Sequence, residues 1–272
     1  MLGLGLAFLY VPILSMIFFS FNNSRLVTVW DADNSPTLRW YVRLLENDQL
    51  LGAAWISLKV AAMTATGAVI LGTIAGLVLT RFRPFRGRAF LSAMTTAPLV
   101  MPEVITGIAM LLLFVSLEQL IGWPEGRGML TITIAHITFA MAYVTVVVQS
   151  RLAGFDDALE EAALDLGARP ATVFFRITLP LILPALVSGW LLAFTLSWDD
   201  VVISQFVAGP GSSTLPMEIF SRVRRGVSPD INALATIMVL IVATGVVLST
   251  LYMKREEKRR ECEEQMARRD GN

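Results

Sequence analysis

Long apolar runs recur along this chain, and they constrain its fold more than any other feature. Each run is long enough to form a helix that crosses the hydrocarbon core of a bilayer, which takes about 20 residues. Of the 272 residues, 55% are hydrophobic and only 16% are charged, and the mean hydropathy is +0.64. A soluble domain could not keep so much apolar surface away from water. The sequence therefore predicts an all-α polytopic membrane protein.

Six apolar segments are predicted to cross the membrane as helices. They cover approximately residues 2–21, 53–80, the second part of 89–121, 129–149, 183–207 and 233–253. The stretch 89–121 is too long for one upright span, so Pro98 and Pro102 are expected to divide it into a short interfacial piece and a membrane helix. In the second segment Ala68, Gly72 and Gly76 share one face, which favours close helix packing within the chain.

The distribution of basic residues predicts which side of the membrane each connection faces. Residues 81–88 carry four arginines and no acidic residue, and the tail at 254–272 begins with a basic run. Short connections rich in Lys and Arg stay in the cytoplasm. Four predicted crossings separate the turn at 81–88 from the tail, and two separate each of them from the polar segment 151–183. All three are therefore predicted to be cytoplasmic, as are both termini, and residues 215–225 are predicted to form an amphipathic helix on the outer side.

The polar segment 151–183 has the pattern of two short helices joined by a turn. Four apolar residues repeat at helical spacing, namely Leu159, Ala162, Ala163 and Leu166. Gly167 fits the position after the first helix, where a left-handed backbone costs glycine little. Pro170 is placed to begin the second helix, and Pro180 is expected to end it. This arrangement suits a docking element better than a membrane span.

The same segment resembles the EAA motif of binding-protein-dependent ABC importer permeases. The motif reads Glu161-Ala162-Ala163, three residues, Gly167, nine residues, and then Ile177-x-Leu179-Pro180, which is its full spacing. In that family the short helix before the glycine is a coupling helix that fits a groove on the ATP-hydrolysing subunit. The resemblance implies a type I ABC importer permease fold, with one transmembrane permease domain over 1–272, a cytoplasmic coupling loop over 151–183 and a charged cytoplasmic tail over 254–272.

The resemblance also implies roles for individual residues of this loop. Glu161 would make polar contacts in the groove, Ala162 and Ala163 would allow close approach, and Gly167 would shape the turn. The full set of predicted coupling residues is Glu160, Glu161, Ala162, Ala163, Asp165, Leu166, Gly167, Ile177, Leu179 and Pro180.

Three further stretches look like the polyamine branch of that family, and most like its putrescine permeases. They are residues 21–30, 96–107 and 189–197. The resemblance implies import of putrescine or spermidine across the bacterial inner membrane. It implies as partners a second homologous permease subunit, a dimer of cytoplasmic ATP-binding subunits, a periplasmic polyamine-binding protein and membrane lipid. The sequence does not name the preferred polyamine.

Acidic residues in or near the spans are candidates for the cargo path, because ionised groups there usually face a water-filled cavity. They are Glu103, Asp199 and Asp200. A helical rise of about 1.5 Å per residue places Glu103 and Asp199 at a similar depth, roughly 20 Å from the inner face. Trp190, Trp198 and Tyr143 could add cation–π contacts to an ammonium group. In the alternative interpretation, the acids are solvated or paired with Arg222.

Several kinds of site are missing from the sequence. The three lysines follow Leu58, Met253 and Glu257, so no Walker A motif with its glycine-lysine pair exists. ATP and Mg²⁺ would therefore bind to a separate ATPase subunit, and no cofactor is expected in this chain. One histidine, His136, and one cysteine do not make a metal site. The net charge of +0 argues against nucleic acid as a partner.

Two other classes of function stay open at this point. One is a secondary transporter of a small organic cation that is driven by an ion gradient. In it the mid-depth acids would bind a proton or cation. Against it, the two halves of the chain show no evident inverted repeat, and the EAA spacing would serve no purpose. The other is an intramembrane enzyme, for which no nucleophile and base or metal motif stands out.

Overall fold

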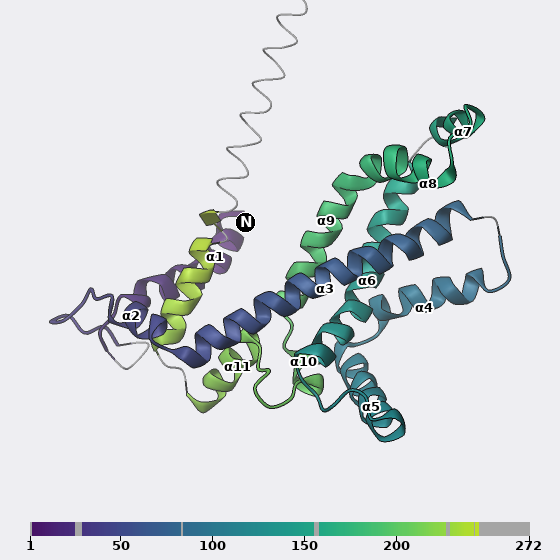
Figure 1. Cartoon of the computed structure of the whole chain (residues 1–272). Helices are drawn as coiled ribbons and strands as arrows, with labels where there is room; N and C mark the ends of the chain where they lie inside the picture. The colour runs from purple at the N-terminus through teal and green to yellow at the C-terminus, as the bar shows by residue number, and fades with distance from the viewer. Residues whose placement is uncertain are drawn as a thin grey trace, which may run out of the picture. The chain divides into compact units, whose positions relative to one another are not determined.

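The computed structural model describes residues 2–24, 29–82, 84–154, 158–226, 229–241 and 243–244. Every regular element within these residues is a helix, which confirms the all-α class (Figure 1). Five helices are long and apolar enough to cross a membrane: Gly3–Ser20, Asp48–Arg81, Glu103–Ile121, Met129–Ala153 and Pro170–Trp198. A shorter apolar helix, Pro229–Ile241, covers the start of the predicted sixth span. Residues 245–272, with the rest of that span and the tail, lie outside the described residues.

The helices have the following bounds in chain order. They are α1 (Leu2–Ser20), α2 (Arg39–Leu45), α3 (Asp48–Arg81), α4 (Arg88–Val100), α5 (Glu103–Ile121), α6 (Met129–Ala153), α7 (Ala158–Asp165), α8 (Pro170–Val173), the π-helical turn η1 (Phe174–Thr178), α9 (Leu179–Trp198), α10 (Val202–Val207) and α11 (Leu215–Arg225). The chain divides into two units, one of Met1–Asp48 with Arg222–Asn272 and one of Gln49–Ser221.

In the first unit, the buried side chain of Asn22 organises the loop that follows α1. Its carbonyl oxygen accepts hydrogen bonds from the backbone N–H of Ser24 at 3.2 Å and of Asp31 at 3.0 Å, and its amide donates to the Val29 carbonyl at 2.7 Å. The indole of Trp40, on α2, donates to the backbone carbonyl of Asn22 at 2.6 Å. These bonds hold α2 against the end of α1.

Arg222 also belongs to the first unit, and it forms an ion pair with Asp230 at 3.0 Å. Its other guanidinium nitrogen donates to the Asn47 side chain at 3.4 Å. The predicted amphipathic helix is present as α11, and its last turn carries three arginines.

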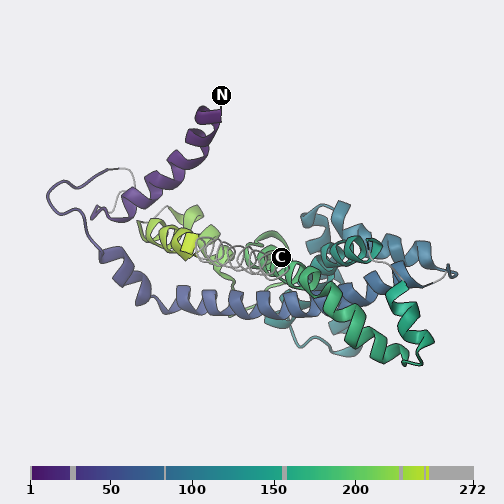
Figure 2. The same cartoon turned by 90° about the horizontal axis from the view of Figure 1, so that it is seen from above.

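The core of the second unit lies where α3, α6 and α9 pack together (Figures 1 and 2). Its fully buried side chains include Ala68, Val144 and Ile182, one from each helix. A Cβ atom added to Gly72 would lie 2.8 Å from the Val144 Cβ, which is too close for real atoms. The small-residue face of α3 therefore packs on α6 of the same chain, as the sequence predicted.

Two helix breaks interrupt the apolar segments of this unit. The predicted division of 89–121 is confirmed, since α4 ends at Val100 and α5 begins at Glu103, although Pro98 lies inside α4. The prediction for the fifth span was wrong in both of its bounds. The helix already runs from Pro170 and ends at Trp198, and residues 199–201 separate it from α10.

Pro180 does not end the helix, because a π-helical turn precedes it. Leu179 donates its backbone N–H to the Phe174 carbonyl, five residues back. In a π turn the hydrogen bonds are already shifted by one residue, and such turns occur as single insertions within α-helices. Pro180 follows directly after this turn, where the backbone hydrogen bonds change from π to α spacing.

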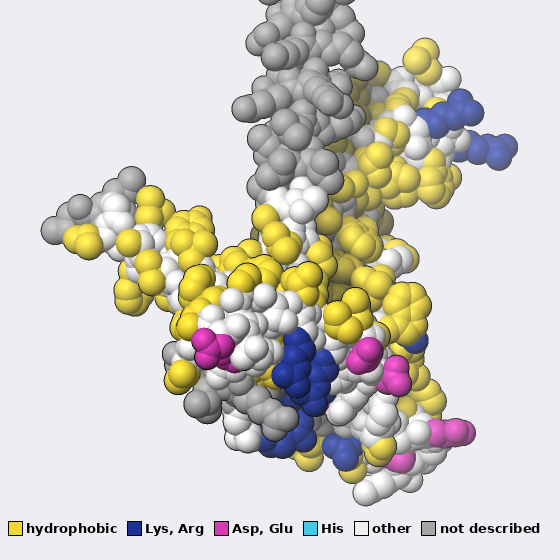
Figure 3. All heavy atoms as spheres, turned by 90° about the vertical axis from the view of Figure 1, so that its left-hand side faces the viewer, with side chains coloured by type: hydrophobic (Ala, Val, Ile, Leu, Met, Phe, Trp, Pro, Cys, Tyr) yellow, Lys and Arg dark blue, Asp and Glu magenta, His cyan; other side chains and the backbone are white. Residues whose placement is uncertain are grey.

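Large apolar side chains remain exposed along the outer faces of the helices. Examples are Phe8 and Leu14 on α1, Phe90 and Met94 on α4, Leu112 and Leu120 on α5, and Leu183 and Leu191 on α9. The face drawn in Figure 3 shows yellow hydrophobic side chains over much of its area, with charged side chains in smaller groups. Surfaces of this kind are stable against lipid or another apolar protein surface.

Candidate functional site

The turn between α7 and α8 has the geometry that the sequence predicted. Gly167 has a φ of +84°, in the left-handed region. Its N–H donates to the Leu164 carbonyl at 2.9 Å, and the N–H of Ala168 donates to the Ala163 carbonyl at 3.0 Å. This pair of bonds is a Schellman motif, which satisfies the last carbonyls of α7. Pro170 then begins α8, as expected.

The outward surface of α7 is exposed and carries both leucines and carboxylates. None of its eight residues, all of which the structure describes, is buried. Leu159 is 54% exposed, and Leu166, directly after the helix, is 89% exposed. Glu161, Ala162 and Asp165 are also exposed. A short helix that presents leucines and carboxylates to solvent at one end of the unit has the character of a docking surface.

The last part of the motif has a different environment. Ile177 is half-buried in η1, and Leu179 packs against the core formed by α3, α6 and α9. Pro180 is exposed. The predicted coupling residues thus divide into an exposed group on α7 and a second group where η1 enters the core.

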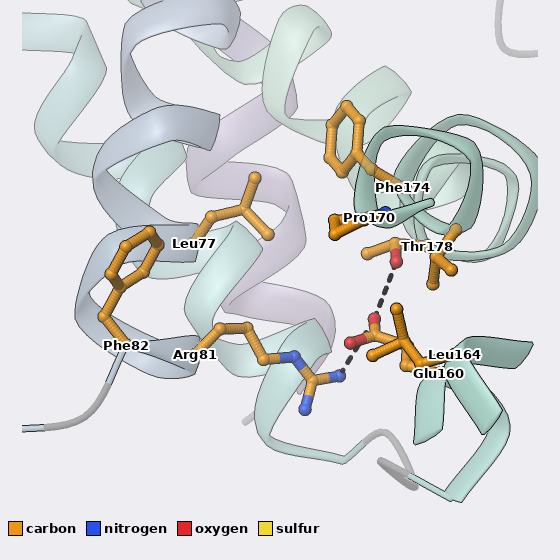
Figure 4. Close-up of a pocket in the computed structure, with 9 residues that line it drawn as sticks. Leu77, Arg81, Phe82, Glu160, Leu164, Pro170, Phe174 and Thr178 are labelled. Carbon is orange, nitrogen blue, oxygen red and sulfur yellow. Dashed lines mark hydrogen bonds and ion pairs between the residues drawn. The ribbon is translucent and has the colours of Figure 1, made fainter. Parts of the chain in front are cut away.

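Glu160 differs from its neighbour Glu161, because its carboxylate turns toward the rest of the unit (Figure 4). Thr178 donates its hydroxyl to Oε1 of Glu160 at 2.6 Å, and a guanidinium nitrogen of Arg81 lies 3.6 Å from the same oxygen. The contact confirms that the arginine-rich turn and the α7–α8 segment lie at the same end of the unit. A cavity of about 370 Å³ adjoins these three residues.

The candidate path acids lie next to helix breaks at the other end of α9. Glu103 is the first residue of α5, and Asp199 follows the last residue of α9; both are exposed. Asp200 precedes α10, and α10 packs closely on α5. Phe206 of α10 fits against Gly107, where an added Cβ would lie 2.5 Å from its ring.

Asp200 belongs to a hydrogen-bonded cluster that sequence reasoning did not find. Its Oδ2 lies 3.1 Å from Nε2 of His136 and accepts the N–H of Ser204 at 2.8 Å, while Oδ1 accepts the N–H of Ile203 at 3.2 Å. Nδ1 of His136 lies 2.7 Å from the Ser197 hydroxyl. Asp200 therefore caps α10 and fastens it to α6.

A signal for this cluster was present in the sequence. Polar residues recur at 197, 200 and 204, which would place them close together on a helix, opposite the single histidine of an apolar span. His136 is buried, and both of its ring nitrogens have hydrogen-bond partners, so it is a satisfied packing residue. Within the described residues, no group of three His, Cys, Asp or Glu side chains is placed to hold a metal ion.

The candidate aromatic residues divide between two places. Trp190 and Trp198 stack on either side of Phe194, with ring centroids 5.3 and 5.8 Å apart, and form a row along α9 that ends beside Asp199. Tyr143 instead contacts the ring edge of Phe139 on α6, at 5.3 Å. The structure adds Phe194 to the predicted set and leaves Tyr143 outside the row.

Comparison with known proteins identifies a family and close relatives. A family model described as "Binding-protein-dependent transport system inner membrane component" matches residues 68–261. The putrescine transport system permease protein PotI of Escherichia coli (strain K12) is 56% identical over 268 residues, which cover 98% of this chain and 94% of that protein. The spermidine/putrescine transport system permease protein PotC of Haemophilus influenzae is 43% identical over 249 residues, with 92% and 93% covered.

Solved structures resemble the fold at low sequence identity. A bacterial ABC transporter involved in the import of the acidic polysaccharide alginate has a TM-score of 0.69 at 15% identity, with 93% of this chain and 92% of that chain covered. The MetNI methionine ABC transporter in an inward-facing conformation has a TM-score of 0.57 at 18% identity, with 74% and 92% covered. These similarities support the ABC permease fold.

The two adjacent aspartates are predicted to differ in their effect on stability. Asp200→Ala leaves two backbone N–H groups of α10 without their acceptor and removes one of the partners of His136. We expect it to lower the free energy of unfolding by about 1–3 kcal/mol. Asp199→Ala, the matched control at an exposed position, should change it by less than about 0.5 kcal/mol. Thermal unfolding of the purified protein in one detergent measures both, and equal midpoints would contradict the capping role of Asp200.

Proposed function

Because the chain belongs to the family of binding-protein-dependent transport system inner membrane components, we propose that it is a permease subunit of an ATP-driven importer of polyamines. The cargo is putrescine or spermidine, and the membrane is the bacterial inner membrane. The family consists of transport permeases and not of enzymes. The observation that carries the polyamine assignment is the 56% identity to a putrescine permease over 98% of the chain.

ATP hydrolysis belongs to a separate subunit in this proposal. The chain has no Walker A motif, so ATP and Mg²⁺ bind to a dimer of cytoplasmic ATP-binding subunits. A second homologous permease subunit completes the pathway, and a periplasmic polyamine-binding protein delivers the cargo. The apolar faces of α1, α4 and α5 are suited to that second subunit and to lipid.

The proposed orientation follows from the basic residues. The turn at 81–88, the coupling loop at 151–183, the tail at 254–272 and both termini face the cytoplasm. The whole of 1–272 then acts as one permease domain. In this orientation α7 presents its exposed leucines and carboxylates to the ATPase, and the break after Trp198 lies toward the outer half of the membrane.

The proposed cargo path follows the exposed acids and the aromatic row. Glu103 and Asp199 offer carboxylates to the two ammonium groups of a diamine, and the faces of Trp190 and Trp198 offer cation–π contacts. The bonds of Asp200 with His136 and α10 favour a supporting role for this residue over direct contact with cargo. Tyr143, which contacts Phe139, has less support than the row on α9.

Transport by the complete complex in proteoliposomes tests the proposed function. We expect uptake of labelled putrescine to require ATP on the ATPase side and to survive ionophores that collapse ion gradients. Unlabelled spermidine as competitor then ranks the two polyamines. Uptake without ATP that ionophores abolish would instead favour an ion-driven secondary transporter.

Gly167→Val is predicted to disturb coupling. A β-branched residue at a φ of +84° costs about 1 kcal/mol or more, so the Schellman turn is expected to shift and to misplace α7. Stimulated ATP hydrolysis by the reconstituted complex should fall while membrane insertion persists. Gly154→Val is the control, because Gly154 lies in the same loop with a φ of −91°. Normal stimulation in Gly167→Val would count against the proposed role of this turn.

Neutralising either path acid is predicted to slow uptake. Loss of one carboxylate that faces an ammonium group should reduce putrescine uptake roughly fivefold, which corresponds to about 1 kcal/mol. The variants are Glu103→Gln and Asp199→Asn, measured as the initial uptake rate per assembled complex. Glu118→Gln, an exposed acid near the far end of the same helix as Glu103, is the control. Unchanged uptake in both acid variants would exclude the proposed path.

A further inference from the structure

One carboxylate oxygen of Glu160 connects three parts of the second unit. It accepts a hydrogen bond from Thr178 at 2.6 Å and lies 3.6 Å from the guanidinium of Arg81 (Figure 4). Thr178 is the last residue of η1 and is buried, and Arg81 is the last residue of α3. Glu160 itself belongs to α7. The oxygen thus lies where the ends of two core helices meet the exposed helix.

Apolar packing does little to hold α7 in place. None of its residues, all of which are described, is buried. A partly open pocket of about 370 Å³ lies between α7 and the ends of α3 and α8, and its apolar lining includes Leu77, Leu164, Val173 and Phe174. A side chain that faces a cavity loses the close contacts that would transmit a displacement. The 2.6 Å hydrogen bond from Thr178 to Glu160, together with the ion pair to Arg81, is therefore the stiffer connection.

The two neighbouring glutamates, Glu160 and Glu161, differ in exposure and therefore in what they can contact. Successive residues of an α-helix point about 100° apart, so Glu160 and Glu161 cannot serve the same surface. Glu161 is exposed on the side that carries the docking surface, and Glu160 reaches inward. The side chain of Glu160 is 21% exposed and that of its partner Arg81 is 18% exposed, so both are largely shielded from water.

We propose that Glu160, Arg81 and Thr178 form a clamp that positions α7 and transmits its displacement to α3 and α9. The proposal rests on the proposed function, in which α7 docks on an ATPase. Thr178 directly precedes α9, so its bond to Glu160 connects α7 to the helix that carries the aromatic row. Arg81 connects α7 to the end of α3. These are positioning residues, and they touch neither nucleotide nor cargo.

The test separates coupling from assembly in the reconstituted complex. Two quantities are measured for each variant: the retention of the ATPase subunit on purification, and the number of putrescine molecules transported per ATP hydrolysed. Glu160→Ala removes both contacts, and Thr178→Val removes the hydrogen bond alone. We expect each to retain the ATPase and its hydrolysis but to lower transport per ATP roughly three- to tenfold.

Matched variants exclude a general effect on folding. Thr178→Ser keeps the hydroxyl and should restore the wild-type ratio. Thr172→Val makes the same chemical change at an exposed position on α8 and should leave the ratio unchanged. If Glu160→Ala fails to assemble, an exchange of the charges at positions 81 and 160 still tests the clamp. Arg81→Glu and Glu160→Arg should each lower the ratio, and the double variant, which again has opposite charges at the two positions, should recover it.

The outcomes that would overturn the clamp differ from those that would overturn the proposed function. A wild-type number of putrescine molecules transported per ATP in both Glu160→Ala and Thr178→Val would contradict the clamp. Loss of the ATPase subunit from Glu160→Ala, without recovery in the charge-exchange double variant, would place Glu160 in the docking surface. This outcome would also contradict the clamp. If the unmodified complex showed no ATP-dependent uptake, the proposed function itself would fail, whatever the variants do.

Discussion

Inside a bilayer, a polar group must find its hydrogen-bond partner within the protein, because hydrocarbon offers none. This constraint explains why the described chain is helical and where its helices are allowed to break. Hydroxyl groups on the spans bond back to carbonyls one turn earlier, as Thr138 does to Ile134 and Thr145 to Met141. The break after Trp198 is possible because Asp200 supplies acceptors for the freed N–H groups of α10, and Nε2 of His136 lies close to both the Asp200 carboxylate and the Ser204 hydroxyl.

The fold followed from the sequence wherever a local rule decided the structure. Run length predicted the spans, Gly167 predicted the left-handed turn, and the spacing of Gly72 and Gly76 predicted close packing within the chain, which the structure shows against α6. Pro102 marked a real break, whereas Pro98 lies inside α4 and Pro180 follows a π turn within a continuous helix. Nothing in the local pattern of apolar residues predicts such a turn, so the fifth span was placed too late in the chain.

The candidate site was predictable in part, for a similar reason. A motif identified the exposed residues of α7, whose surroundings are set by their own helix. Arg81 lies 79 residues before Glu160, and His136 lies 64 residues before Asp200. Such pairings depend on how α3, α6 and α9 pack. Glu160 and Glu161 look alike in sequence, and only the tertiary arrangement gives one a buried partner and leaves the other in solvent.

The π turn η1 has a consequence for the angular phase of α9. It inserts one residue into the helical repeat, and one residue corresponds to a rotation of about 100°. The face on which Trp190, Phe194 and Trp198 align is therefore set by this insertion, relative to the face on which Thr178 meets α7. Removal of a single residue from Phe174–Thr178 would leave a continuous apolar helix of nearly the same length and composition. The aromatic row would then point about a quarter turn away from its present neighbours, so the insertion fixes which side of the helix faces the interior.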